Sequence, residues 1–215
     1  MISLSTWDIL QFLLLAARWT LLLSAIAFIG GGIGALLLLL LRYARPQWGA
    51  RFVYYYIELF QGTPLLLQLF LVFFGLPLLG IEVSPLLAAS VALILYAGAF
   101  LAEIWRGCVD AIPRGQWEAS AALGLNFLAQ MRDVILPQAL RIAVPPTVGF
   151  LVQLLKATAL SSIVGFNDLT RAGTIVTNAT FQPFLVYGLV ALIYFAMCYP
   201  LTVCSRLLER RLGSY

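Results

Sequence analysis

Glu118-Ala119-Ser120-Ala121-Ala122-Leu123-Gly124, followed after nine residues by Val134-Ile135-Leu136-Pro137, is a short Ala-rich stretch between long hydrophobic runs. Its side chains are too small and too weakly polar to make a good membrane span. They would instead form a compact surface that a groove in another protein can hold closely. The stretch therefore indicates a membrane subunit that a partner protein drives from outside the bilayer.

A short helix over residues 116–123 is the structure we expect here. Gly124 would end it, because glycine accepts the left-handed conformation at a helix C-terminus without penalty. Pro137 would lie in the first turn of the next helix, where its missing N–H costs nothing. At i, i+4 spacing, one side of the short helix would carry Trp117, Ala121 and Leu125.

The alternative for this helix is a position on the lipid surface, but such helices usually have bulky apolar faces and Lys/Arg-rich faces. We therefore favour a helix that docks on a partner. The residues expected at the contact are Gln116, Trp117, Glu118, Ala119, Ser120, Ala121, Ala122, Leu123 and Gly124.

The composition is that of an integral membrane protein. Of the 215 residues, 62% are hydrophobic and 10% are charged, whereas a soluble domain is about half apolar and a quarter charged. The apolar runs reach the roughly 20 residues that a helix needs to cross a bilayer. They are continuous rather than alternating, which favours helices over a β-barrel. We expect an all-α protein with one domain, residues 1–215, and about five spans: 21–41 (with a possible start near residue 9), 52–79, 86–104, 142–166 and 184–203.

The arginines predict the orientation of the spans. They gather between the first and second spans, between the third and fourth spans, and after the fifth. These arginines are Arg42, Arg45, Arg51, Arg106, Arg114, Arg132, Arg141, Arg206, Arg210 and Arg211. The positive-inside rule then places the loop 106–141 and the C-terminus in the cytoplasm, and the N-terminus outside.

The sequence offers no catalytic or metal-binding pattern. It contains no histidine, and its cysteines, Cys108, Cys198 and Cys204, lack the spacing of metal ligands. It also lacks the Gly-x-x-x-x-Gly-Lys-Ser/Thr loop that holds the phosphates of ATP. We therefore expect no cofactor and no enzyme activity in this chain, and active transport would draw its energy from another subunit.

The opening stretch resembles the EAA motif of ABC importer permeases, whose coupling helix sits in a cleft of the ATPase subunit. Other segments resemble the polar amino-acid branch, of the histidine and glutamine permease type: GTPLLLQLF from Gly62, AEIWRG from Ala102, ILPQALR from Ile135 and LLKATALSSIVG from Leu154. The resemblance implies the type I importer permease fold in the bacterial inner membrane. It also implies a polar amino acid as substrate, two ATPase subunits that bind ATP and Mg, a second permease (identical or related) and an extracytoplasmic solute-binding protein.

Three positions depart from the family pattern. Ser120 stands where Ala is usual, which is a small-for-small change. Gln61 stands where an Arg typically precedes Gly-Thr-Pro, and Ala157 where an Asp often follows the Lys. The last two departures remove charges near the membrane pathway, so the substrate of a better-known relative does not transfer to this chain.

Ionisable groups inside membrane spans usually face a cavity or a partner. At about 1.5 Å per residue, Lys156 would lie about 21 Å from the cytoplasmic side. There it could reach a substrate carboxylate, pair across a subunit interface, or extend to the outer interface. Glu103 could pair with an arginine of the loop, and Glu58 could serve helix packing or a cytoplasmic gate.

The Gly62-Thr63-Pro64 break points to a cavity, because irregular backbone within a membrane is tolerated mainly where protein or water satisfies it. The residues that we expect along the pathway are Gly62, Thr63, Pro64, Gln68, Tyr96, Gln153 and Lys156. Pro145 and Pro146 should bend or break the fourth span and form a hinge next to the loop. The Gly-x-x-x-Gly pair formed by Gly30 and Gly34 predicts close helix packing.

Two other functions compete with an importer permease. A self-contained secondary transporter or channel would be supported by inverted repeats and paired broken helices, and no internal repeat is visible. A non-transporting scaffold would not need the polar breaks of the second span or Lys156. We expect the permease subunit of an ATP-driven importer for polar amino acids, with access alternating as the docked helix moves.

Overall fold

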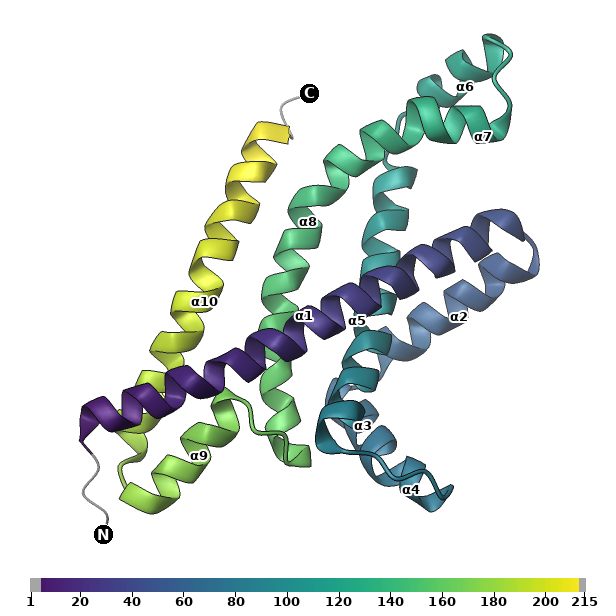
Figure 1. Ribbon diagram of the computed structural model, residues 1–215. Helices are drawn as coiled ribbons and strands as arrows, with labels where there is room; N and C mark the ends of the chain where they lie inside the picture. Colours follow the sequence, from purple (N-terminus) through teal and green to yellow (C-terminus); the bar gives the residue numbers. More distant parts are fainter. Residues whose placement is uncertain (1–4, 213–215) are drawn as a thin grey trace.

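A computed structural model describes residues 5–212, and every regular element in this range is a helix (Figure 1). The long helices are α1 (Thr6–Ala44), α5 (Pro85–Asp110), α8 (Leu136–Ala157) and α10 (Pro183–Leu212). The shorter ones are α2 (Trp48–Gly62), α3 (Leu65–Phe70), α4 (Leu76–Leu78), α6 (Arg114–Ala122), α7 (Phe127–Ala129) and α9 (Leu169–Thr180). π-Helical turns at Leu71–Gly75 and Gln130–Ile135 and a 3₁₀ turn at Thr158–Val164 join some of them. The predicted all-α class is confirmed.

Four helical runs are long and apolar enough to cross a membrane: α1, α5, Phe127–Val164 and α10. The remaining predicted span is a pair of helices, Trp48–Gly62 and Leu65–Leu78. The chain bends by 100° between them. Thr63 is extended because a following proline disfavours the helical conformation of the residue before it. Five spans are thus present only if the bent pair counts as one, and 52–79 is not a single helix.

The spans extend beyond the purely apolar runs. α1 begins at Thr6, close to the possible start near residue 9 and well before residue 21, and a capping box holds its first turn. The Ser5 side chain accepts a hydrogen bond from the Trp7 N–H at 3.3 Å, and the Asp8 carboxylate accepts one from the Ser5 N–H at 3.1 Å. At the other end of the chain, α10 continues through its basic last turn to Leu212.

Close packing of α1 on α5 confirms the role expected for Gly30 but not for Gly34, where an added Cβ atom would meet nothing within 4 Å. A Cβ atom added at Gly30 would lie 2.8 Å from the Ile94 side chain, and one added at Gly31 would lie 2.5 Å from the Ala97 Cβ. Both distances are shorter than real Cβ contacts allow. Small residues therefore let the two helices approach closely, as is common in membranes.

The double proline of the fourth span does not break it. α8 runs without interruption through Pro145 and Pro146, and it curves along its length in Figure 1. The carbonyls that lose their helical N–H partners are those of Arg141 and Ile142, four residues before each proline. The Ser205 hydroxyl of α10 donates instead to the Pro145 carbonyl at 2.9 Å, which joins α8 to α10 next to the prolines. The predicted break is therefore wrong, and a hinge at this position stays a prediction.

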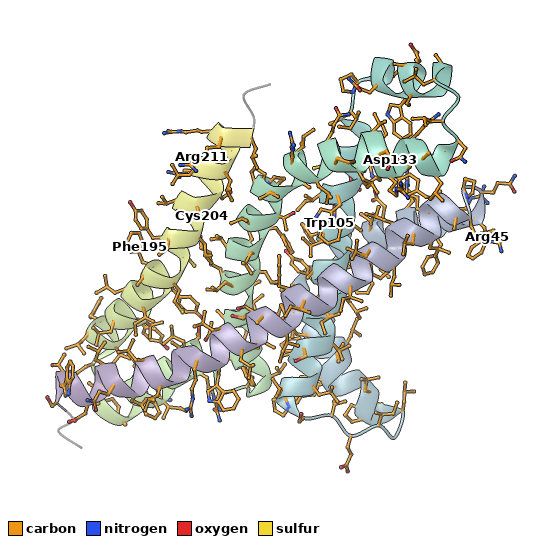
Figure 2. All side chains as sticks on the ribbon, turned by 45° about the horizontal axis from the view of Figure 1, so that its top comes forward. Arg45, Trp105, Asp133, Phe195, Cys204 and Arg211 are labelled. Atoms are coloured by element: carbon orange, nitrogen blue, oxygen red, sulfur yellow. The ribbon has the colours of Figure 1, made fainter. Side chains whose placement is uncertain are left out.

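The bundle has two distinct ends. Figure 1 shows the α6–α7 corner and the C-terminal ends of α5 and α10 at the top, and α4 and α9 at the bottom. In Figure 2, Arg45 marks the end of α1, Asp133 lies close to the α6–α7 corner, and Arg211 marks the end of α10. The inter-span arginines thus gather toward the end that carries α6.

Candidate coupling helix and membrane pathway

α6 is a separate helix that stands out from the bundle (Figure 1). Gly124 follows it with φ +77°, the left-handed conformation that favours glycine. The Gly124 N–H donates to the Ala121 carbonyl at 2.9 Å, and the Leu125 N–H donates to the Ser120 carbonyl at 3.2 Å. These bonds satisfy carbonyls of the last turn, so the predicted terminator is confirmed.

One side of α6 packs against the rest of the chain through Trp117 and Ser120. Trp117 contacts a buried cluster from α5 and the segment after α7, and its ring stacks on Phe127 with centroids 6.5 Å apart. Ser120 is 3% exposed, and its hydroxyl donates to the Trp117 carbonyl at 2.9 Å. The expected grouping of Trp117 with Ala121 is wrong, because Ala121 is exposed. The inward face follows i, i+3 spacing instead.

The other side of α6 is open. Arg114 and Gly115 are exposed in its first turn. After them, the exposed residues are Gln116, Glu118, Ala119, Ala121, Ala122, Leu123 and Gly124. Leu123 is 81% exposed, and Leu128 on the adjoining α7 is 75% exposed. We call the seven residues from Gln116 to Gly124 that are exposed, without Leu128, the α6 outer face. Ser120, the departure from the family motif, is absent from it.

The connection from α6 to α8 is more continuous than expected. Asn126 caps α7, since its side-chain oxygen accepts from the Ala129 N–H at 3.0 Å. A helical run then continues from Phe127 through a π-turn into α8, and Pro137 lies in the first turn of α8, as predicted, although that helix is continuous with the run before it. The wider π-turn precedes the proline, where an ordinary turn would bring its ring against a carbonyl.

Two contacts tie this connection to the helices next to it. Gln138 on α8 donates to the Val134 carbonyl at 2.8 Å and to the Gln116 side chain of α6 at 3.5 Å. Further along α8, the Thr147 hydroxyl accepts from the Trp105 indole N–H of α5 at 2.9 Å. The orientation of α6 is thus linked through side chains to both α5 and α8.

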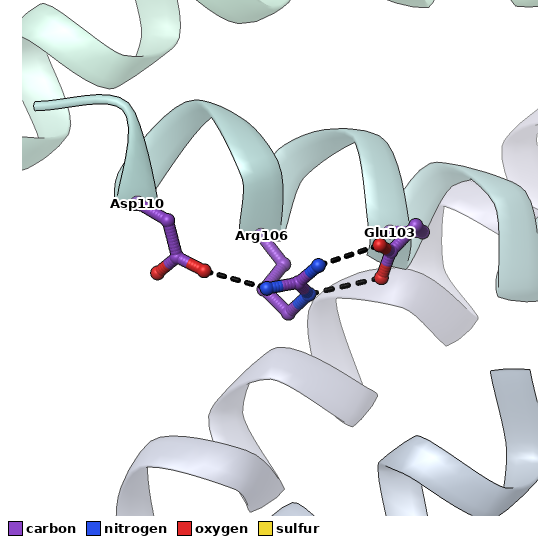
Figure 3. Close-up of polar contacts among 3 residues, drawn as sticks. All are labelled: Glu103, Arg106 and Asp110. Carbon is purple, nitrogen blue, oxygen red and sulfur yellow. Dashed lines mark hydrogen bonds and ion pairs between the residues drawn. The ribbon is translucent and has the colours of Figure 1, made fainter.

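The ion pair predicted for Glu103 is confirmed (Figure 3). Arg106 lies three residues later on α5 and donates through Nε to one Glu103 oxygen at 2.9 Å and through a terminal nitrogen to the other. Its remaining terminal nitrogen contacts Asp110 at 2.6 Å. Arg106 therefore belongs to α5 and not to a loop, and the loop predicted over 106–141 is restricted to the residues that flank α6.

Thr63 and Gln68 are brought together at the break between α2 and α3. Gln68 is 6% exposed, and its amide nitrogen donates to the Phe60 carbonyl, the Thr63 carbonyl and the Thr63 hydroxyl at 2.9–3.1 Å. The Thr63 hydroxyl donates in turn to the Leu59 carbonyl at 2.7 Å. These side chains satisfy the backbone that Gly62 and Pro64 interrupt, which is how irregular backbone persists in a membrane.

The other predicted pathway residues lie apart from this break. Tyr96 on α5 is half-buried in an aromatic group, 4.5 Å from the Phe100 ring and 6.3 Å from the Phe150 ring between centroids. Gln153 and Lys156 are both exposed on α8. Lys156 forms no ion pair within residues 5–212. Its contact with a substrate or a second subunit stays a prediction.

One charged side chain was read from the sequence only as an orientation signal. Arg42 lines a cavity together with Glu58, which is exposed. The packing and gate roles expected for Glu58 stay predictions. A signal was available, since Tyr54, Glu58 and Gln61 repeat at helical spacing within an otherwise apolar span.

Comparisons with known proteins agree with this geometry. A family model described as binding-protein-dependent transport system inner membrane component matches residues 30–214. The chain is 36% identical over 200 residues to a probable amino-acid ABC transporter permease of Bacillus subtilis, covering 92% of this chain and 87% of that protein. It is 34% identical over 211 residues to the glutamine transport system permease of Escherichia coli, covering 96% and 95%.

A solved structure shares the whole architecture. It is described as the crystal structure of an amino acid ABC transporter with histidines, and it superposes on this chain with a TM-score of 0.90 at 31% identity. The match covers 98% of this chain and 100% of that chain. The fold that contains the bent α2–α3 pair and the projecting α6 is therefore common to both proteins.

Proposed function

This chain belongs to the family of binding-protein-dependent transport system inner membrane components and is the permease subunit of an ABC importer for amino acids; from this premise we propose that α6 is its docking helix for the ATPase. As a permease it is a non-catalytic, multi-pass inner-membrane subunit of a family without cofactors. The partner ATPase binds ATP.

The α6 outer face is the observation that carries the proposal. It combines small side chains, one carboxylate at Glu118 and a projecting apolar residue, Leu123, which is 81% exposed. Small residues let a second backbone approach closely, and an exposed apolar side chain is a suitable anchor for a pocket. A lipid-surface helix would instead present bulky apolar and basic faces.

Mechanical support behind α6 fits the same function. Trp117 fixes α6 on the buried cluster beneath it, and Gln138 joins it to α8. A displacement of the outer face by a bound partner would therefore be transmitted to α5 and α8, which belong to two of the membrane-spanning runs. Rigid-body movement of packed helices is a common way in which a local event changes access elsewhere.

The remaining assembly follows from the family. We assign the complex two ATPase subunits, a second permease (identical or related) and an extracytoplasmic solute-binding protein. The arginines at the α6 end support a cytoplasmic position for α6 and the C-terminus, with the N-terminus outside. The substrate class is polar amino acids, as supported by the glutamine permease and the histidine-containing structure among the similar proteins.

A double charge change tests the docking role. Glu118→Lys with Gly124→Asp reverses the only charge of the outer face and forces a side chain into the left-handed conformation at φ +77°. We expect the variant to reach the membrane but to lose ATPase in co-purification and ATP-dependent uptake in proteoliposomes. Glu82→Lys, an exposed residue between α4 and α5 at the opposite end, is the matched control. Wild-type ATPase retention and uptake by the double variant would contradict the proposal.

A further inference from the structure

A cavity of about 280 Å³ lies between α1, α2 and α5. It opens near the end of α5 that leads into α6, because two of its lining residues lie in the last turns of α5. The polar and charged residues that line it are Arg42, Tyr54, Glu58, Gln61, Glu103 and Arg106. Charged side chains on spanning helices usually face a cavity through which a solute passes, or a partner.

The charges around this cavity differ in whether they are already paired. Arg106 is held by Glu103 and Asp110, so that three-residue group is largely self-satisfied. Arg42 on α1 and Glu58 on α2 form no ion pair within residues 5–212. The cavity therefore presents one unpaired cation and one unpaired anion from two adjacent helices.

We propose that this cavity is a transit site for the zwitterionic backbone of an amino acid, with Arg42 facing its carboxylate and Glu58 facing its ammonium. The proposal rests on the proposed function, since it places the cargo of the importer. A guanidinium matches the geometry of a carboxylate, and a carboxylate accepts strong charge-assisted hydrogen bonds from an ammonium. Each free end of the ligand thus meets a group of opposite charge.

The size and the neutral neighbour of the cavity support the same ligand class. Pockets of about 300–1,000 Å³ hold drug-sized molecules, so 280 Å³ suits a smaller solute. Gln61 contributes an amide where an arginine is typical of the family, which leaves Arg42 as the one lining cation outside an ion pair in the described range. A site on a transport path must also release its ligand, so weak binding is expected.

Ligand analogues that remove one charge at a time test the site. The complex is purified with its ATPase subunits and without the solute-binding protein, and titrated with L-glutamine, its α-amide and N-acetyl-L-glutamine. The wild type should prefer L-glutamine. Glu58→Gln should lower the affinity for L-glutamine about tenfold and leave the affinity for the N-acetyl analogue unchanged. Arg42→Gln should lower the affinity for L-glutamine by a similar factor and leave the affinity for the α-amide unchanged.

Controls separate this role from a general loss of structure. Glu58→Asp keeps the charge and should keep the ligand preference, and the matched neutralisations Glu82→Gln and Arg45→Gln, outside the cavity, should behave as the wild type. Retained ATPase subunits and an unchanged unfolding midpoint show that a variant is folded. A variant at Arg42 or Glu58 that lowers the affinity for all three ligands equally would overturn the proposal.

Two further results would also overturn it. One is the same ligand preference in Glu58→Gln as in the wild type. The other is the absence of L-glutamine binding to the wild-type complex. The proposed site recognises only the ammonium and carboxylate groups, which all amino acids share, so it should bind L-glutamine whatever the natural substrate is. If proteoliposomes with the wild-type complex still take up amino acids, only the site falls. If the complex neither retains the ATPase nor takes up amino acids, the proposed function itself fails.

Discussion

α6 and α9 are both short helices between two membrane-spanning runs, at opposite ends of the bundle, but they bury their side chains very differently (Figure 1). α6 has nine residues, of which only Ser120 is buried. α9 has 12 residues and buries Leu169, Ala172, Gly173, Val176 and Thr180 against α1 and α10.

The start of α9 is held by buried polar contacts that α6 lacks. Asp168 is fully buried and caps the helix by accepting from the Arg171 N–H at 2.9 Å, and Tyr194 of α10 lies 3.4 Å from its other oxygen. The Leu169 N–H donates to the Thr20 hydroxyl of α1 at 3.1 Å. The chain itself completes α9, whereas it leaves one whole face of α6 uncovered.

A matched leucine pair gives the largest expected contrast in stability. Leu169→Ala in α9 removes a side chain with no exposed surface and should lower the free energy of unfolding by about 2–5 kcal/mol. Leu123→Ala in α6 removes one that is 81% exposed and should change it by less than about 0.5 kcal/mol. Chemical denaturation of the purified protein in one detergent measures both. Equal losses would mean that α6 is not a free surface in the isolated chain.

The pH dependence of stability should follow α9 and not α6. Burial raises the pKa of the Asp168 carboxyl above its ordinary value, although hydrogen bonds from Arg171 and Thr170 oppose the shift. A carboxyl with a raised pKa in the folded state stabilises fully below its ordinary pKa of about 4, and this contribution is lost as the pH rises through the folded value.

The contribution of Asp168 to the unfolding midpoint of the wild type should therefore fall with rising pH over that window. Asp168→Asn keeps a good capping residue but cannot titrate, so its midpoint should lack this component. Thermal unfolding of both proteins across a pH series provides the comparison. An identical pH profile for the two would remove Asp168 as the cause.

The two helices also differ in how well the sequence predicts them. α6 carries a compact motif with its own stop signal at Gly124, so its existence and limits were accessible. α9 lies between two spans with no comparable motif, and its buried residues become recognisable only once α1, from the start of the chain, lies against it. Long-range contacts of this kind, such as that of Leu169 with Thr20, leave little local signal.

Backbone interruptions were harder to predict than apolar runs. The break at Thr63 and Pro64 was visible, but the 100° bend depends on how Gln68 satisfies the freed backbone. At Pro145 and Pro146 a similar local signal produced no break, and Ser205 from a helix far along the chain contacts the Pro145 carbonyl. A proline therefore indicates where a helix is weakened, but it does not by itself determine that the helix ends there.

The smallest expected effect sharpens the division of α6 into two faces. Ser120→Ala introduces the residue typical of the family and loses only a hydrogen bond within the helix, so we expect a stability change within about 0.5 kcal/mol and normal uptake. Ser120→Leu should cost about 1–3 kcal/mol, because the site is buried and already packed. Denaturation and uptake assays on both variants measure this. Tolerance of leucine would place Ser120 on the outer face.

Cysteine labelling tests most directly the claim that an ATPase covers the α6 outer face. In a background with Cys108, Cys198 and Cys204 replaced by alanine, Ala121→Cys on α6 and Asn178→Cys on α9 each provide one exposed thiol. Maleimide labelling is measured on the permease with and without the ATPase subunit. Protection of Ala121→Cys by the ATPase, with unchanged labelling of Asn178→Cys, is the predicted result, and equally fast labelling of Ala121→Cys in both preparations would contradict it.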